Sequence, residues 1–499
     1  MTVTDAPIAE PAAPEPFFTR EEGRWTHQWK ELYEEVITSG LCTGCSACVI
    51  ACPHDVIGYE HKEGGYKPFH IEEELGLADC GHGQKGCTSC TRACPRFRDW
   101  EPTAEEHLFG RIRETEEIHG IAEQTLLVRA ADDHVHQTGQ DGGLVSAILI
   151  WLLDEGYIDG ALVSGLEGDG SSWKAKPMVA TTKDEVLATA GSRYTYSANW
   201  LAYDEAKEKG LENLALVGMG CQTSAAPVMW SRKIGKVGKP IRFTIGLLCS
   251  KTFDDRIFDE LFDAKYGIKR ETIKKMNIKG VFQIWTHDDE YHEVPLKECH
   301  AWTREGCNHC PDFAAEHADI STGGIGKFND YTLTVVRTEL GREVMTRMAK
   351  AGVIEVKPAE EDPAAIALMD RLSRVSRNRW PEQAIGFPKL MPPPPPKKKK
   401  KAAPADAEAK TKEPADAAAA PADGTPAAPA KVDAELKAAD TAPATPATDP
   451  AEAKVGEQVA DVAADAAPGP AVTAEPPSAQ ADEPVAPPPT PDASEPTSS

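Results

Sequence analysis

Four closely spaced cysteines near the start of the chain have the side chains and the spacing of an iron–sulfur site. Cys42, Cys45, Cys48 and Cys52 stand in the segment LCTGCSACVIACP, with the pattern C-x2-C-x2-C-x3-C-P. This pattern is typical of bacterial ferredoxins, in which three thiolates bind one [4Fe–4S] cluster and the fourth binds a second cluster. A zinc site is the alternative, but such a site normally has two separated C-x2-C pairs.

A second cysteine group, DCGHGQKGCTSCTRACP, has the end of the same pattern but a displaced beginning. Cys87, Cys90 and Cys94 give the spacing C-x2-C-x3-C-P, whereas Gln84 occupies the position of the first ligand. Cys80 is the nearby substitute. The intervening GHGQKG contains three glycines, which allow the chain to bulge outward and return without strain.

A two-cluster ferredoxin fold predicts how these eight thiolates divide between two clusters. One cluster is expected to have the ligands Cys42, Cys45, Cys48 and Cys94, and the other Cys80, Cys87, Cys90 and Cys52. A single zinc ion bound by His82 and three of the cysteines is the alternative, but it leaves Cys52 without a role. The sequence therefore favours a ferredoxin-like α+β module with two [4Fe–4S] clusters over residues 21–105.

Strand-like and helix-like segments alternate from about residue 124. The segments TLLVRAA, ALVSGL, MVATT, NLALVGMG and IRFTIGLL are expected to be strands, and helices are expected between and around them. This alternation predicts an α/β domain with a largely parallel sheet, which we place over residues 106–388.

Four further cysteines could form a third metal site in this domain. Cys221 and Cys249 follow two expected strands that are one βαβ unit apart, so both should emerge at the carboxyl edge of adjacent parallel strands. Cys307 and Cys310 supply a C-x2-C pair. A lone cysteine at a strand end is more often a buried apolar residue, and zinc also fits four thiolates. The neighbouring ferredoxin-like module favours iron–sulfur, and Cys299 is expected to be a bystander.

Two short segments could bind an anion. Gly142 and Gly143 stand at an expected helix start, where free N–H groups and the helix dipole suit a pyrophosphate. Glycine at such a place more often only forms a turn. Ser192 and Arg193 could bind phosphate, although an isolated arginine is more often part of a surface ion pair.

Composition limits the location and the partners of the chain. The 499 residues contain 13 cysteines and carry a formal net charge of −25. The acidic balance argues against nucleic acid as a partner. No signal peptide is evident, and the longest apolar run, residues 143–153, is too short to cross a bilayer. We expect a cytoplasmic protein whose thiols stay reduced.

Both ends of the chain are predicted to be disordered. Residues 1–20 are rich in alanine and proline, and residues 389–499 form a Pro/Ala-rich acidic tail. Beyond Lys401 the tail has no aromatic residue and no cysteine, so it cannot bury enough apolar surface to offset the entropy of ordering.

The order of several motifs gives a resemblance to a known family. The segments QDGGLVSAIL, GSRYTYSAN, GMGCQT, GLLCSKTF and REGCNHCPDFAAEHADISTGGIG resemble the beta-subunit family of coenzyme F420-reducing hydrogenase and F420-dependent formate dehydrogenase. The resemblance covers roughly residues 28–375. It implies a flavin-binding α/β domain with its own [4Fe–4S] cluster at Cys221, Cys249, Cys307 and Cys310.

The resemblance also implies an FAD site beside that cluster. The matching residues are Gln140, Asp141, Gly142, Gly143, Ser192, Arg193, Tyr194, Asp319, Ser321, Gly323 and Gly326. Lys251 is a further candidate for contacting an anionic cofactor. Two departures leave the cofactor contacts open: Gly220 stands where many members have proline, and the glycine at 323 is doubled by Gly324.

The expected function is electron transfer between three [4Fe–4S] clusters and FAD, with hydride exchange with coenzyme F420. No acid or base side chain is indicated, so the chemistry is expected to be centred on the flavin. The donor would be a hydrogenase or dehydrogenase catalytic subunit or a ferredoxin. Two alternatives are a ferredoxin-dependent reductase of another organic substrate, such as a chlorophyll-type pigment, and a relay subunit without its own substrate.

Overall fold

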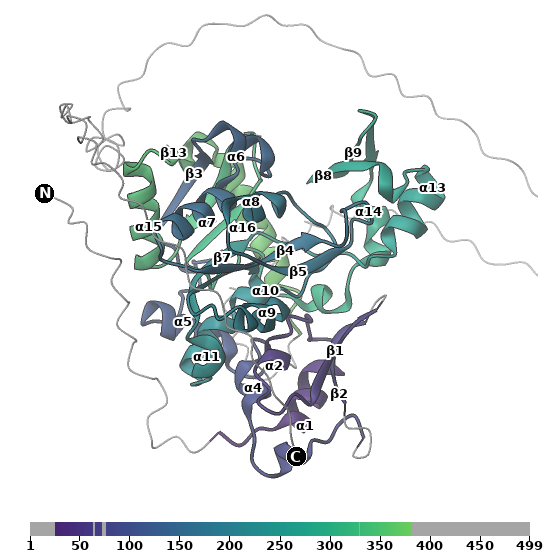
Figure 1. Cartoon of the computed structure of the whole chain (residues 1–499), viewed down its shortest axis with the longest axis vertical. Coiled ribbons are helices and arrows are strands. Elements are labelled where there is room, and N and C mark those ends of the chain that lie inside the picture. Colours follow the sequence, from purple (N-terminus) through teal and green to yellow (C-terminus); the bar gives the residue numbers. More distant parts are fainter. Residues whose placement is uncertain (1–24, 63–64, 72–75, 329, 382–499) are drawn as a thin grey trace, which may run out of the picture.

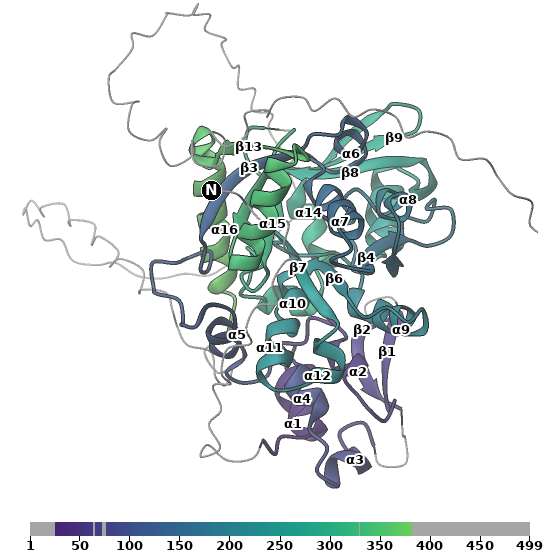
Figure 2. The ribbon, with the colours of Figure 1, turned by 60° about the vertical axis from the view of Figure 1, so that its left-hand side comes forward.

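The computed structural model of the chain describes four segments, which are residues 25–62, 65–71, 76–328 and 330–381. The segments predicted to be disordered, 1–20 and 389–499, lie outside these described residues. In Figure 1 the N-terminal part (purple) lies at the bottom, below a larger α/β body (blue to green). Figure 2, turned by 60°, shows the same two parts one above the other.

The N-terminal part consists of short helical segments around one hairpin. The helices are α1 (Trp29–Leu32), a π-helical turn (Tyr33–Ile37), α2 (Ala47–Ile50), α3 (Gly81–Gln84), α4 (Ser89–Ala93) and α5 (Trp100–Phe109). Strands β1 (Ile57–Lys62) and β2 (Gly65–His70) pair antiparallel. Its apolar core combines Trp29, Leu32 and Phe97 with cysteine side chains. We expect so small an apolar core to need a further source of stability, such as a metal centre bound by its cysteines.

The body is built on an eight-stranded sheet. Its strands are β3 (Gln124–Ala130), β4 (Gly160–Leu166), β5 (Ala175–Ala180), β6 (Leu214–Met219), β7 (Ile241–Leu247), β11 (Ile320–Gly323), β12 (Thr332–Val336) and β13 (Ile354–Pro358). Their order is β13-β3-β12-β11-β7-β6-β4-β5.

Strand direction in this sheet follows the sequence prediction over four adjacent strands and departs from it on either side of them. The adjacent strands β11, β7, β6 and β4 are parallel, and β3 has the same direction. In contrast, β5, β12 and β13 run antiparallel to their neighbours. The connection from β4 to β5 is too short for a crossover helix, so these two strands can only form a hairpin.

Helices cover both faces of the sheet. The longest are α7 (Leu144–Asp154), α15 (Glu339–Lys350) and α16 (Pro363–Arg377), and the shorter ones are α6 (Asp133–Thr138), α8 (Lys183–Ala188), α9 (Ala202–Glu208), α10 (Gly220–Thr223), α11 (Ala225–Ser231) and α12 (Gly235–Gly238). Successive residues of β3 point to opposite faces of the sheet. Val128 packs with α7 and α15, whereas Leu127 packs with Met369 of α16.

A second, three-stranded sheet was not predicted from the sequence. Its antiparallel strands, in the order β10-β9-β8, are β8 (Ile273–Lys279), β9 (Val281–Thr286) and β10 (Tyr291–Val294). Helices α13 (Ala264–Tyr266) and α14 (Leu296–Cys299) and the π-helical turn Phe258–Asp263 accompany it, at the upper right of Figure 1. Phe258, Phe262 and Phe282 form its core with Cys299, whose thiol is fully buried there.

Buried arginine side chains join the N-terminal part to the body. Arg232, at the end of α11, donates hydrogen bonds to the carbonyl oxygens of Thr91, Cys94, Phe97 and Arg98 at 2.9–3.3 Å. A single body residue therefore satisfies four backbone acceptors of the loop that ends the cysteine-rich region.

A buried ionic network lies close to this junction. Arg113 forms ion pairs with Glu105, Glu316 and Glu101, the last at 3.1 Å. Arg377 of α16 pairs with the same Glu316 and, at 2.9 Å, with Glu101. All five side chains are 2% exposed or less, so each charge relies on its partners rather than on water.

Within the described residues, no helix combines the length and the apolar character needed to cross a membrane.

The ionic network gives a stability prediction. Arg113→Met is expected to lower the free energy of unfolding by about 3–5 kcal/mol, because it leaves Glu105 buried without its arginine and Glu316 with Arg377 alone. The measurement is urea unfolding followed anaerobically by tryptophan fluorescence. The control is Arg342→Ala at the exposed pair with Glu123, for which we expect about 0–1 kcal/mol. Equal effects of the two substitutions would contradict this interpretation.

Candidate metal centres

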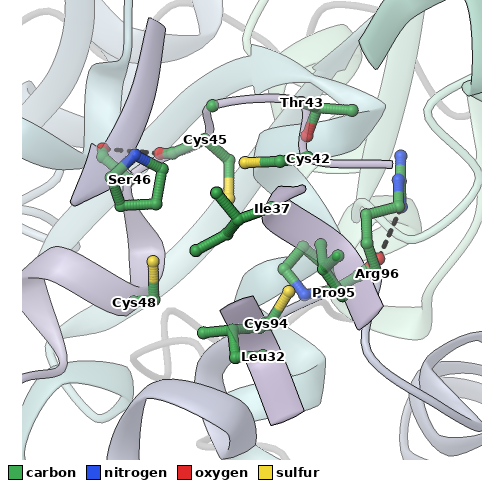
Figure 3. A pocket seen from close by; sticks show the side chains of 13 residues that line it. Leu32, Ile37, Cys42, Thr43, Cys45, Ser46, Cys48, Cys94, Pro95 and Arg96 are labelled. Atoms are coloured by element: carbon green, nitrogen blue, oxygen red, sulfur yellow. Dashed lines mark hydrogen bonds between the residues drawn. The ribbon is translucent and has the colours of Figure 1, made fainter. Parts of the chain in front are cut away.

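The first group of cysteines surrounds one cavity, which we call the inner site. The cavity is lined by Cys42, Cys45, Cys48 and Cys94. Figure 3 shows their sulfur atoms facing the same space. The loop that carries the first three cysteines turns through left-handed backbone at Gly44, with φ +70°, and Ser46, with φ +66°. A Cβ at Gly44 would lie 2.0 Å from the carbonyl oxygen of Tyr66, so only glycine fits there.

Burial disfavours the charged form of these thiols. It raises the pKa of Cys45 to about 12, and the neighbouring Cys94 adds to the rise. Burial also raises the pKa of Cys48, with further contributions from Cys45 and Cys94. Thiolates become stable at such a place when a bound metal centre displaces their protons. The donor set and its surroundings therefore fit an iron–sulfur cluster.

The second group, which we call the outer site, surrounds a separate cavity. This cavity is lined by Cys52, Cys80, Cys87 and Cys90. Cys80 precedes α3 and its Sγ accepts a hydrogen bond from the Gly83 N–H at 3.4 Å. The insertion after Cys80 thus forms one helical turn, rather than the outward bulge expected from its glycines. The turn brings Cys80 to the other three sulfur atoms.

A pair of histidines lies beside the outer site. The rings of His54 and His82 stack, with centroids 3.7 Å apart and an angle of 7° between planes, and both residues line the cavity. In the zinc alternative, His82 replaces Cys52 as a ligand. The structure places Cys52 at the same cavity as the other three cysteines, so four thiols and His82 line it together.

The third group, which we call the body site, consists of Cys221, Cys249, Cys307 and Cys310. Cys221 lies in α10 directly after β6, and Cys249 follows β7, the parallel neighbour of β6. The pair Cys307 and Cys310 comes from the 3-10 turn Glu305–His309 and its end. Burial raises the pKa of Cys249, and Cys307, Cys221 and Cys310 raise it further. The four thiols are therefore close enough to interact electrostatically.

The inner site lies between the other two. Burial and the other inner-site thiols raise the pKa of Cys48, and Cys90 of the outer site raises it further. In the same way, Cys45 of the inner site contributes, after burial and the body-site thiols, to the raised pKa of Cys221. These interactions give the order outer, inner, body. The groups match those predicted from the sequence, and their role as cluster ligands stays a prediction.

Buried residues that the sequence analysis missed surround the body site. Arg96 donates a hydrogen bond to Cys310 Sγ at 3.5 Å, and the Tyr196 hydroxyl lies 4.0 Å from Cys221 Sγ. Arg304 donates to the carbonyl oxygen of Thr43 at 2.9 Å and lies over the Tyr196 ring. The only signal for Arg96 is its place directly after Cys94-Pro95.

The glycine-rich loop before α7 differs from its prediction in one respect. The Gly142 N–H donates to Thr332 Oγ1 at 3.2 Å, and the Gly143 N–H donates to the Gln140 carbonyl oxygen at 3.3 Å. The two N–H groups expected to be free for an anion are therefore engaged within the protein. The side-chain nitrogen of Gln140 is buried without a partner, and it is the donor that fits a ligand here.

Asp141 connects this loop to the doubled glycine and to the second sheet. Its backbone has a φ of +49°, and its carboxylate lies 3.5 Å from Lys279 Nζ. A Cβ at Gly324 would lie 1.5 Å from Asp141 Oδ2, so the second glycine makes room for this carboxylate. A Cβ at Gly323 would contact the Leu248 side chain, one residue before Cys249.

The next predicted segment, Ser192 to Tyr194, lies in the same region. Its side chains bind other parts of the protein, whereas the sequence predicted that they face an anion. Arg193 Nη1 donates to three carbonyl oxygens at the end of α8, between 2.5 and 2.8 Å, and so caps that helix instead of facing an anion. Ser192 hydrogen-bonds with Tyr194, whose hydroxyl donates to Asn277 Oδ1 at 3.2 Å. Burial raises the pKa of Tyr194, and the nearby Asp141 and Cys249 raise it further.

Two of the predicted flavin-side residues are part of the buried framework. Asp319 accepts hydrogen bonds from Thr244 and Thr338, and Ser321 donates to the Ala315 carbonyl oxygen. These polar atoms are already satisfied within the protein. Gly326, with φ +104°, packs against Asp362, where a Cβ would lie 2.3 Å from the carboxylate.

Lys251 lies two residues after Cys249 of the body site. Burial lowers its pKa, and the nearby Arg379 lowers it further. Arg379 itself donates to the carbonyl oxygen of Ser250 at 2.6 Å. Lys251 is therefore next to a second cation, which is compatible with an anionic ligand.

Glu101, Glu105 and His317 form another group with metal-ligand side chains. Their donor atoms lie within 4.8 Å of one another. Arg113 and Arg377 already pair with these carboxylates, so the group is an ion-pair network rather than a cation site.

Comparison with known proteins agrees with this arrangement of an α/β sheet and cysteine sites. Residues 125–202 and 211–362 match the family models described as the N-terminal and C-terminal parts of the coenzyme F420 hydrogenase/dehydrogenase beta subunit, and residues 35–58 match a 4Fe-4S binding domain. The fold and the sites define an iron–sulfur electron-transfer oxidoreductase.

Individual relatives show the family to which the chain belongs. The coenzyme F420 hydrogenase subunit beta of Methanothermobacter thermautotrophicus is 35% identical over 266 residues, which are 52% of this chain and 94% of the relative. The coenzyme F420-dependent sulfite reductase of Methanocaldococcus jannaschii is 32% identical over 64% of this chain and 47% of its own length. The chain belongs to the coenzyme F420 hydrogenase/dehydrogenase beta-subunit family.

A solved structure is similar in fold to part of this chain. A chain of the F420-reducing [NiFe] hydrogenase complex from Methanosarcina barkeri matches with a TM-score of 0.50 and 30% identity. The match covers 52% of this chain and 91% of that chain.

The displaced ligand gives the next prediction. Cys80→Ser is expected to remove about four irons per chain, because a [4Fe–4S] cluster at the outer site would lose one of its four thiolates. The measurement is iron analysis of anaerobically purified protein. Cys299→Ser, a buried thiol outside the three sites, is the control and should leave the iron content unchanged. An unchanged iron content in Cys80→Ser would show that Cys80 is not a ligand.

Proposed function

We propose that the chain is an iron–sulfur flavoprotein that passes electrons between a redox partner protein and coenzyme F420. In this proposal residues 21–105 bind two [4Fe–4S] clusters, and residues 106–388 bind a third cluster and FAD. Bound clusters supply one-electron transfer, and a bound flavin converts between single electrons and hydride. Support for F420 as the substrate comes from relatives that are named for this coenzyme.

One observation carries the proposal: the series of cysteine sites ends at the predicted flavin residues. Cys249 of the body site follows Leu248, which packs against Gly323, and Gly324 makes room for Asp141. The contacts run without a gap from the third cysteine site to the glycine-rich loop. This edge lies beyond the carboxyl ends of parallel strands, where open α/β sheets bind ligands.

The side chains at this edge are suited to holding a ligand rather than to acid–base chemistry. Gln140 offers a buried donor without a partner, and the Asp141 carboxylate is paired with Lys279. Arg193, Asp319 and Ser321 fix the surrounding backbone. We therefore propose that the chain positions the flavin and leaves the hydride exchange to the cofactor.

We infer that the partner meets the outer site. Among the proposed ligands of this site, Cys80 and Cys87 are only half-buried, and the inner site separates them from the body. The partner would be the catalytic subunit of a hydrogenase or dehydrogenase, or a ferredoxin. The small hydride carrier would enter at the opposite end, near Gln140.

Anaerobically purified protein is expected to show a flavin spectrum and about 12 irons per chain. Adding reduced F420 should bleach the flavin band and then the iron–sulfur absorbance. Cys249→Ser should retain the flavin bleaching but lose most of the reduction of the iron–sulfur absorbance, because the body site lies between the flavin edge and the other sites. Cys299→Ser serves as the matched control and should behave like the unmodified chain.

Three outcomes would change the proposal. Zinc in place of iron removes the electron-transfer function. A flavin that reduced F420 does not bleach moves the substrate to another organic molecule. Iron without any flavin leaves a relay subunit.

A further inference from the structure

Arg96 lies between the inner site and the body site. It follows the inner-site ligand Cys94 by two residues and lines the inner cavity. Its side chain is 3% exposed and reaches the body, where Nη2 donates to Cys310 Sγ at 3.5 Å. Arg96 thus connects the two sites, since its backbone follows an inner-site cysteine and its guanidinium binds a body-site cysteine.

Two further contacts hold the guanidinium in this place. Nη1 donates to the Pro95 carbonyl oxygen at 2.6 Å, as Figure 3 shows, and the group lies 4.4 Å from the centroid of the Trp100 ring. The remaining nitrogen, Nε, is buried without a partner. Burying a charge with an unsatisfied donor costs free energy, so neighbouring groups must stabilise the guanidinium.

The compensation comes from the body site. An arginine guanidinium stays charged in proteins, and the hydrogen bond to Cys310 Sγ places this charge against a proposed ligand of the body site. A thiolate ligand carries negative charge, so the guanidinium and the ligand stabilise each other.

We propose that Arg96 is a positioning residue that raises the reduction potential of a cluster at the body site through its hydrogen bond and charge at Cys310. This rests on the proposed function, in which that site holds a [4Fe–4S] cluster. Reduction adds one negative charge to the cluster, and a fixed positive charge beside a sulfur ligand stabilises that state more than the oxidised one. Hydrogen bonds to the sulfur ligands act in the same direction.

A purely structural role is the alternative, and Arg232 provides the matched control. Arg232 is also a buried arginine at the junction, also packs on a tryptophan, and donates only to backbone carbonyl oxygens in its four contacts across the junction. If Arg96 only ties the two parts together, replacing either arginine should have similar consequences.

The test is a redox titration of the whole chain followed by electron paramagnetic resonance. The signal of the body cluster is first assigned by its loss in Cys249→Ser. Arg96→Gln is expected to shift the one-electron reduction equilibrium of that cluster at least tenfold toward the oxidised form, which is a fall of at least 59 mV. Arg96→Lys keeps the charge but not the forked geometry, and should give a smaller shift of at least threefold.

The control and the iron content separate the outcomes. Arg232→Gln should leave the body-cluster midpoint unchanged, within a threefold shift in the equilibrium. A midpoint that stays unchanged in Arg96→Gln at full iron content overturns the proposal. If Arg96→Gln does not fold, an unchanged midpoint in Arg96→Lys overturns it equally. Absence of a body-cluster signal in the unmodified chain would instead contradict the proposed function.

Discussion

The gathering of twelve thiols in three compact groups, seven of them buried and five half-buried, is the constraint on which the rest of the structure depends. Each group takes sulfur atoms from segments that are distant in the chain, as when Cys94 completes the inner site. Burial raises the pKa of Cys45, Cys48 and Cys90, so their thiolates need compensating positive charge. We infer that the N-terminal part, with its small apolar core, folds together with its metal centres.

The junction between the two parts satisfies a second requirement, which is a fixed position of the inner site relative to the body site. Buried polar contacts supply it: Arg232 binds four carbonyl oxygens, and Arg304 reaches across to Thr43. Buried charges of this kind add little net stability compared with apolar packing, but they allow one geometry only. The same arginines place positive charge near cysteine thiols, Arg232 near Cys94 and Arg304 near Cys307. The same arginine side chains therefore fix the position of the inner site and compensate the negative charge of thiolates.

The sequence predicted which cysteines lie together but not the other side chains that surround them. The C-x2-C spacing was enough to group the inner cysteines, and the ends of two parallel strands were enough to bring Cys221 near Cys249. The three-stranded sheet was not predicted: its first strand, β8, contains three lysines and buries Ile273 and Met276, three residues apart, so it lacks the strict alternation that indicates a half-buried strand. The role of Arg96 was missed because its acceptor, Cys310, lies more than 200 residues away. Spacing along the chain contains no information about such a contact.

The predicted flavin residues show a second limit of prediction from sequence. Asp319, Ser321 and Arg193 are polar residues in the right region, yet each uses its side chain to fix the backbone, with partners on β7, α8 and the loop before β11. A motif match cannot distinguish a residue that touches a ligand from one that shapes the loop beside it. The distinction depends on which hydrogen bonds are already satisfied. By that criterion Gln140, with its unpaired buried nitrogen, is the strongest candidate for direct contact at this edge of the sheet.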